Sequence, residues 1–290
     1  MLAGIVLGLG ASACWALANV AVQRASREVG PARALLWAQV AGIAMVGLFA
    51  LPLDHGAVTV SAATGVWVAA AGVAALLGYG CMFYSFAHGR LTLAVPIMSS
   101  WAALASGLSL AMFDERLSAP QLGGGAAVVV GAMVVARFSQ GAPGTEAAPA
   151  GARIPRWLLA SFGAALGFGV LIPVIRKLSP VFGELRTISV VYAADILLGL
   201  PLGRLYRIPL GPPRGRQWWP VVLAGLFETA GFACITFGGR LAPLAVVSPL
   251  ASLAAALTIL YAWIVLGDRP ARGVMVGAAL VCAGVVALAL

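Results

Sequence analysis

The sequence has few charged side chains: 18 basic and nine acidic residues make up 9% of its 290 residues. Soluble proteins carry about a quarter charged residues, so this scarcity excludes an ordinary soluble domain. Hydrophobic residues form 62% of the chain, and the mean hydropathy is +1.01. The composition therefore predicts an integral membrane protein that crosses the lipid bilayer several times.

Cysteine and histidine are also scarce. The four cysteines lie inside hydrophobic segments without a Cys-x-x-Cys spacing, and the two histidines are isolated. This pattern disfavours a disulfide framework and a metal site, and we expect neither a metal nor a cofactor. The HExxH, GxSxG and P-loop motifs are absent from the sequence, so ATP-driven transport would require a separate subunit.

Ten hydrophobic runs approach the roughly 20 residues that a helix needs to span a bilayer. They lack the alternation of barrel strands, so the predicted class is an all-α integral membrane bundle. Because no basic residue precedes the first run, we expect a retained helix rather than a cleaved signal peptide. The ten predicted transmembrane helices are Leu2–Val22, Ala34–Leu53, Ala63–Phe86, Leu91–Met112, Gln121–Ala136, Trp157–Ile175, Thr187–Leu202, Trp218–Gly238, Leu241–Leu266 and Val274–Leu290.

Landmark residues of the first half recur in the second half, about 150 positions later. Gly89–Leu91 (Gly-Arg-Leu) corresponds to Gly239–Leu241, which is also Gly-Arg-Leu. After three added residues, further landmarks coincide at an offset of 153: Pro96 with Pro249, Ser99 with Ser252, Gly124 with Gly277, and Gly131 with Gly284.

Each half carries five predicted spans. Because five is odd, the second half must enter the membrane from the opposite side. We therefore predict two inverted five-helix repeats, residues 1–137 and 157–290, joined by a linker at residues 138–156. Inverted repeats are common in secondary transporters, where exchanging the roles of the halves gives two related conformations. A duplication kept only for folding is the alternative.

Two acidic residues, Asp195 and Glu228, lie in the middle of predicted spans. A charge at bilayer depth costs at least about 2.5 kcal/mol, so such residues generally face a polar cavity or change their protonation state. Burial favours the neutral form of a carboxyl group. If Glu228 releases its proton when a cavity opens to water, it can couple transport to protons. The alternative is a neutral Glu228 that only hydrogen-bonds a neighbouring helix.

Other polar and aromatic residues in the spans are candidates for lining a substrate site. Tyr192 lies three residues before Asp195 and shares its helix face. Pro96 and Pro249 each free a backbone carbonyl one turn earlier, so they are candidate hinges near the midplane; a simple kink is the alternative. The remaining candidates are Trp15, Asn19, Tyr79, Ser99, Trp101, Ser248 and Ser252.

The landmarks resemble a known repeat. Gly-Arg-Leu, then Pro and Ser, then an apolar helix ending in Asp114–Ser118, are similar to the EamA-type repeat of the drug/metabolite transporter superfamily. The second copy departs from that repeat at Asp268, where glutamate is usual. The resemblance covers essentially the whole chain. It implies a ten-helix secondary transporter of small metabolites, often an exporter, in a bacterial inner membrane.

The net charge is +9, and the 18 basic residues lie in loops and at the ends of the predicted spans. There they meet anionic lipid headgroups, so we expect the lipid bilayer, and no nucleic acid, as a partner. About 13 basic residues follow odd-numbered spans and about five follow even-numbered ones. The positive-inside rule then places both termini outside the cell, whereas the resemblance implies cytoplasmic termini.

These observations favour a secondary transporter of small amphipathic metabolites such as amino acids, acting by alternating access as a monomer or homodimer. The resemblance implies that it is an exporter. Protons are a candidate coupling ion, and passive facilitation of the same substrates is the alternative. An intramembrane enzyme or lipid-handling protein would need a catalytic cluster that the sequence does not reveal, so we expect no enzymatic activity. A scaffold or sensor is disfavoured by the short loops.

Overall fold

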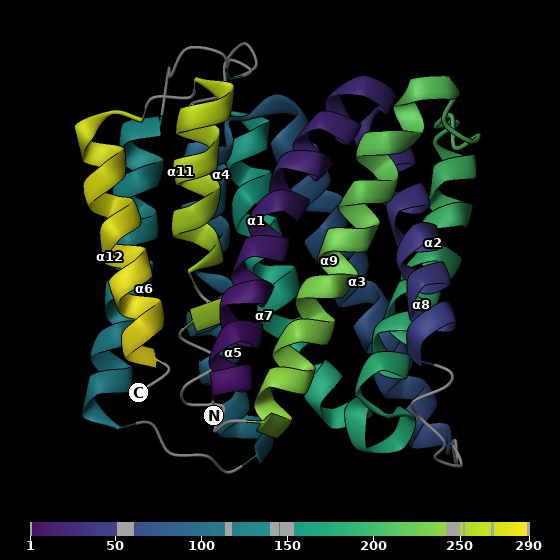
Figure 1. Cartoon of the computed structure of the whole chain (residues 1–290), viewed down its shortest axis with the longest axis horizontal. Coiled ribbons are helices and arrows are strands. Elements are labelled where there is room, and N and C mark those ends of the chain that lie inside the picture. The colour runs from purple at the N-terminus through teal and green to yellow at the C-terminus, as the bar shows by residue number, and fades with distance from the viewer. Residues whose placement is uncertain are drawn as a thin grey trace.

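The computed structural model describes residues 2–50, 61–113, 118–139, 145, 154–241, 250–251, 253–267 and 270–288. All regular structure in these residues is helical, which confirms the predicted all-α class. Most helices lie roughly along one common axis (Figure 1). The helices are α1 (Leu2–Val29), α2 (Pro31–Ala50), α3 (Ala62–His88), α4 (Leu91–Met98), α5 (Trp101–Phe113), α6 (Ala119–Ser139), α7 (Arg156–Phe182), α8 (Glu184–Leu205), the 3-10 turn η1 (Gly215–Gln217), α9 (Trp218–Leu241), α11 (Ala254–Leu266) and α12 (Arg272–Leu288).

Seven of the described helices are long and apolar enough to cross a membrane: α1, α2, α3, α6, α7, α8 and α9. The predicted fourth, ninth and tenth spans correspond to shorter apolar segments around α4–α5, α11 and α12. Large apolar side chains such as Leu48, Leu197 and Ile264 are more than two-thirds exposed. Such a surface suits lipid rather than water, and the chain is an integral multi-pass membrane protein.

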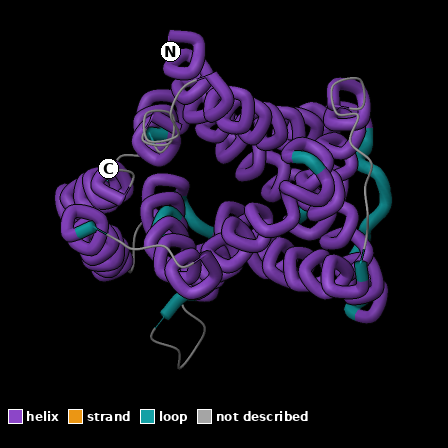
Figure 2. Tube along the Cα trace, turned by 90° about the horizontal axis from the view of Figure 1, so that it is seen from below, coloured by secondary structure: helices purple, strands orange, loops and turns teal. Residues whose placement is uncertain are grey.

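Helices of the two halves pack in exchangeable pairs. Helix α1 packs along α9. By the repeat, α7 is the counterpart of α1 and α3 is the counterpart of α9, and α7 packs along α3 in the same way. Helix α6 packs along α12 at one side of the bundle, near the C-terminus (Figure 2), and α2 packs against α8 at the other side (Figure 1). The main hydrophobic core lies where α1, α2, α3, α7, α8 and α9 meet.

Glycines make the contact between α6 and α12 symmetric. A side-chain carbon on Gly131 would lie 2.7 Å from the carbonyl oxygen of Gly277, and one on Gly284 would lie 2.6 Å from that of Gly124. The offset of 153 exchanges these two contacts. Since Gly124, early in α6, meets Gly284, late in α12, the two helices are antiparallel. Equivalent helices thus run in opposite directions, as an inverted repeat requires.

The predicted fourth span, Leu91–Met112, was expected to be one helix, but it is interrupted between α4 and α5. Pro96 supplies no N–H to the helix ladder, and the Ser99 hydroxyl donates to the carbonyl of Val95 at 2.9 Å. The turn closes where the N–H of Ser100 donates to the Ile97 carbonyl at 3.1 Å. In the second half, the N–H of Leu253 donates to the Leu250 carbonyl at 3.2 Å, the same turn at an offset of 153.

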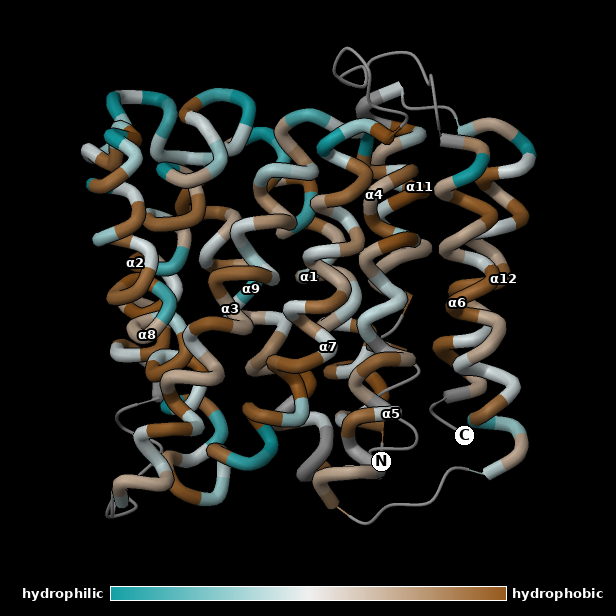
Figure 3. Tube along the Cα trace, turned by 180° about the vertical axis from the view of Figure 1, so that it is seen from behind, coloured by the Kyte–Doolittle hydropathy of each residue, from teal (hydrophilic) through white to brown (hydrophobic). Residues whose placement is uncertain are grey.

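Most described basic residues lie at the end of the bundle where α1 ends and α2 begins, whereas α1 begins and α12 ends at the opposite end (Figure 1). Hydrophilic loops gather at the end where α1 ends and α2 begins, along the upper edge of Figure 3. At the other end lie Arg176, Lys177, Arg186 and Arg240. The end where α1 ends and α2 begins is here called the arginine-rich end. Its described basic residues are Arg24, Arg27, Arg33, Arg90, Arg137, Arg156, Arg204, Arg207, Arg214, Arg216 and Arg272.

Candidate functional site

Glu228 lies in the middle of α9, where glycines let two helices of the first half come close. A side-chain carbon on Gly225 would clash with the carbonyl oxygen of Ala38 on α2. One on Gly231 would lie 2.5 Å from the indole nitrogen of Trp15 on α1. The backbone of α9 therefore packs tightly against α1 and α2, and Glu228 of the second half faces helices of the first.

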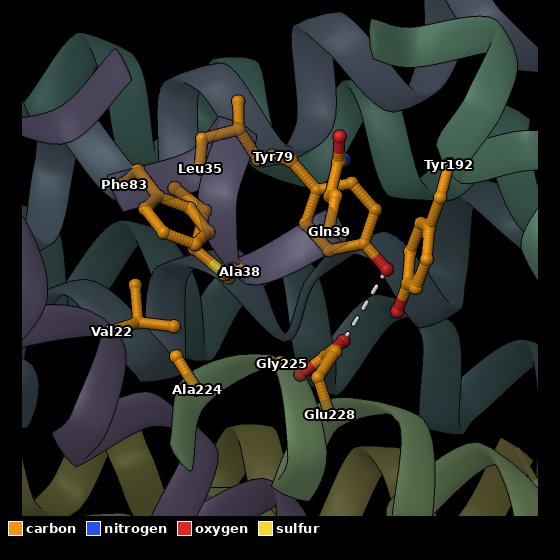
Figure 4. A pocket seen from close by; sticks show the side chains of 11 residues that line it. Val22, Leu35, Ala38, Gln39, Tyr79, Phe83, Tyr192, Ala224, Gly225 and Glu228 are labelled. Atoms are coloured by element: carbon orange, nitrogen blue, oxygen red, sulfur yellow. Dashed lines mark hydrogen bonds between the residues drawn. The ribbon is translucent and has the colours of Figure 1, made fainter. Parts of the chain in front are cut away.

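Two tyrosines, one from each half, face the carboxylate of Glu228 (Figure 4). The Tyr79 hydroxyl on α3 donates a hydrogen bond to Oε1 of Glu228 at 3.4 Å. Tyr192 on α8 lies edge-on to Tyr79, with ring centroids 5.9 Å apart. Both tyrosines are buried, and Tyr79 also packs against Phe168 on α7 at 4.9 Å. The ring contacts hold both hydroxyls toward Glu228.

A small cavity lies beside this carboxylate. Its interior of about 20 Å³ has room for about one water molecule. Its walls come from both halves: Val22, Leu35 and Gln39 belong to the first half, and Tyr192 and Glu228 to the second. Since the walls belong to different halves, movement of one half against the other would change the size of the cavity.

Asp195 lies one turn beyond Tyr192 on α8 and is only 1% exposed. The side-chain amide of Gln39 donates a hydrogen bond to its Oδ2. A second, larger cavity of about 300 Å³ reaches Asp195 between α2, α3, α8 and the segment after α8. Leu35 and Gln39 line both cavities. In Figure 4 the amide of Gln39 points away from Glu228.

Trp15 and Asn19 line neither cavity. The Trp15 ring packs edge-on against Phe232 of α9, 5.4 Å between centroids. Its indole N–H is buried and has no hydrogen-bond partner among the described residues. Asn19 donates to the Thr258 hydroxyl on α11 at 3.0 Å. These two residues therefore contact α9 and α11.

The candidates around the interrupted fourth span also lie outside both cavities. Pro96 is buried within α4, Ser99 bonds its own helix, and the Trp101 carbonyl approaches Gly169 on α7. Ser248, Pro249 and Ser252 lie outside the described residues. The structure thus brings four predicted residues, Tyr79, Tyr192, Asp195 and Glu228, into one region.

The sequence profile of the EamA-like transporter family matches residues 2–137 and again residues 155–290. The chain belongs to the EamA-like transporter family. This confirms the resemblance and its two-repeat architecture, and it assigns the chain to a family of membrane transporters. No curated protein sequence matches the chain significantly. A protein of known crystal structure is similar over 98% of this chain and 95% of its own, with 18% identity and a TM-score of 0.63; it shares the fold.

Sequence reasoning missed two polar residues of this EamA-like chain. Gln39 contacts Asp195, and Thr229, next to Glu228, is 2% exposed with its hydroxyl 2.7 Å from where a side-chain carbon on Gly42 would lie. Gln39 is an uncharged polar residue inside the apolar second span, and that placement was the available signal. Among the described residues, no three His, Cys, Asp or Glu residues are grouped so as to hold a metal.

Proposed function

We propose that this EamA-like chain is a secondary transporter that exports small amphipathic metabolites, such as amino acids, across a bacterial inner membrane. Its ten spans would form two inverted halves, residues 1–137 and residues 157–290, which a linker at residues 138–156 joins. The observation that carries the proposal is the cavity beside Glu228, whose walls come from both halves. With about 20 Å³ it admits a water molecule but not an amino acid, so substrate entry requires the halves to separate.

In this proposal Glu228 carries the proton. A carboxyl group in apolar surroundings favours its neutral form, and it ionises when water reaches it. Rocking of the halves would alternately expose Glu228 to the two sides, so a proton is taken up on one side and released on the other. Tyr79 and Tyr192 would contact Glu228 or the substrate, and Asp195 is the second carboxylate. Pro96 and Pro249 would act as hinges beside the helix interruptions.

Flux through proteoliposomes tests the proposal. The purified chain is reconstituted, and uptake of a labelled panel of amino acids and related amines is measured with and without a pH gradient. We expect saturable flux of at least one compound, accelerated by the gradient. Saturable flux that ignores the gradient would instead identify a passive facilitator. Absence of flux for the whole panel, in vesicles that contain folded protein, contradicts the proposal.

We also propose that the arginine-rich end lies in the cytoplasm. Eleven described basic residues lie at this end, and four lie toward the other, a bias typical of cytoplasmic loops. A phosphatase reporter fused after Leu290 should therefore be active, because that terminus would lie outside the cytoplasm, while a fluorescent reporter that folds only in the cytoplasm should stay dark. The opposite pair of signals would reverse the orientation, and a reporter inserted at Gly211 serves as the internal control.

A further inference from the structure

The larger cavity runs from the middle of the bundle toward the arginine-rich end. Asp195 lies at its inner part. Leu205, at the end of α8, is ten positions further along the helix, which is roughly 15 Å. The chain after α8 folds back over the outer part: the N–H of Ile208 donates to the Gly203 carbonyl at 2.8 Å. Ile208 and Leu210 of this segment line the cavity.

The segment after α8 is fastened to α2. The Arg33 guanidinium donates to the carbonyl of Gly211 at 2.6 Å and to that of Pro212. The Trp37 indole donates to the Leu210 carbonyl at 3.1 Å. The charge of Arg33 is thus directed at backbone oxygens of this segment. The walls of the cavity are therefore held in place from both α2 and α8.

The cavity contains one acidic group and no basic group among its described lining residues. Asp195 receives a hydrogen bond from the neutral amide of Gln39, and the described residues contribute no ion pair to it. A carboxylate in apolar surroundings is costly unless a positive charge accompanies it. A cation that entered the cavity would supply the partner that an ionised Asp195 lacks among the described residues.

The other walls indicate an organic cation. Most lining residues are aliphatic, including Leu36, Leu76, Ile196 and Leu200, and polar groups come chiefly from Gln39 and two tyrosines. Apolar cavities tend to stay dry and to bind apolar molecules, which disfavours a water-filled proton path. A volume of about 300 Å³ lies at the small end of the range for ligand pockets.

We propose that this cavity is a binding site for small amphipathic amines, with the ammonium group on Asp195 and the apolar part along α2 and α8. A zwitterionic amino acid fits less well, because its carboxylate would enter apolar walls without a basic partner. Leu35 and Gln39 connect this cavity to the Glu228 cavity. A role for the site as a step in transport rests on the proposed function. As a binding site it can be tested alone.

Equilibrium binding of labelled 2-phenylethylamine to the full-length chain in lipid nanodiscs provides the test. We expect saturable binding above that of empty nanodiscs. The neutral analogue 2-phenylethanol should compete at least about tenfold more weakly, since its hydroxyl carries no positive charge to pair with the Asp195 carboxylate. Asp195→Asn should weaken amine binding by a similar factor, because it removes the charge and keeps the shape.

A second variant keeps Asp195 and fills the space. Gly80 on α3 lines the cavity, and a side-chain carbon there meets nothing within 4 Å, so Gly80→Leu should fold and block the amine. Gly123→Leu is the matched control, since Gly123 on α6 is equally open and lies away from the cavity. Its amine binding should equal that of the wild type.

Three results would overturn the amine site. They are no saturable binding to the wild type, undiminished binding to both Asp195→Asn and Gly80→Leu, or binding that survives Asp195→Asn and is lost in Glu228→Gln, which would place the amine beside Glu228. Binding needs neither a gradient nor flux. Failure of transport in proteoliposomes would therefore leave this site standing, and failure of amine binding would leave the transport proposal standing.

Discussion

A Glu228→Gln variant is expected to lose gradient-driven accumulation of substrate while it keeps the fold. Glutamine has the shape of glutamate and still offers an oxygen to the Tyr79 hydroxyl, which donates to Oε1 at 3.4 Å in the wild type, but it cannot release a proton. At one proton per substrate, a gradient of one pH unit sustains a roughly tenfold concentration ratio, or about 1.4 kcal/mol. That ratio should fall to about one in the variant.

The measurement is the accumulation ratio of the best compound of the panel, in proteoliposomes with and without the gradient. Tyr79→Phe is the matched control: it removes the hydroxyl that faces Glu228 but leaves the titrating group. We expect Tyr79→Phe to alter the rate and to keep a gradient-dependent ratio. Full gradient dependence in Glu228→Gln would show that the carboxylate is structural, as a helix-bonding group, and that protons move elsewhere or not at all.

Gly131→Leu is expected to be strongly destabilising, because the space beside Gly131 is occupied by backbone. A side-chain carbon there would lie 2.7 Å from the Gly277 carbonyl oxygen and 2.8 Å from the Val281 nitrogen. Flexible side chains can move aside, but helix backbone cannot do so without separating α6 from α12. Overpacking costs about 1–3 kcal/mol, and we expect the upper end of this range.

Thermal unfolding in detergent measures this effect. A dye that reacts with exposed thiols can report it, because all four cysteines are partly buried. We expect the midpoint for Gly131→Leu to fall by roughly 5–10 °C. Gly123→Leu, on the same helix but with nothing within 4 Å of the added carbon, should unfold within about 2 °C of the wild type. Equal midpoints for the two variants would mean that α6 and α12 are not in glycine contact.

The sequence allowed the helical class, the repeat and the mid-helix positions of the two carboxylates to be predicted, because each depends on position along the chain. The offset that pairs Gly124 with Gly277 and Gly131 with Gly284 also pairs their contacts. The neighbours of a helix face could not be predicted in the same way. Trp15 and Asn19 share a face of α1, but tertiary packing decides that this face meets α9 and α11.

The role of Gln39 illustrates the same limit. Its polarity marks it within the second span, but its value as a partner of Asp195 depends on α2 lying against α8, which the spacing of residues along one helix does not specify. Helix interruption was also hard to predict. A proline in a membrane helix is compatible with a kink or with a break, and the hydroxyls of Ser99 and Ser100, bonded to the carbonyls of Val95 and Ile97, accompany the break.

The glycine contact between α6 and α12 bears on the ancestry of the chain. Because each side of the contact is the counterpart of the other, it is isologous, as in a symmetric homodimer. A half-length ancestor with glycines at the positions of Gly124 and Gly131 would already carry both sides, so two copies inserted in opposite directions could associate. Gene fusion would then tether an existing dimer. At the same offset of 153, Glu228 corresponds to Ala75, so the two copies would have diverged at this position after the fusion.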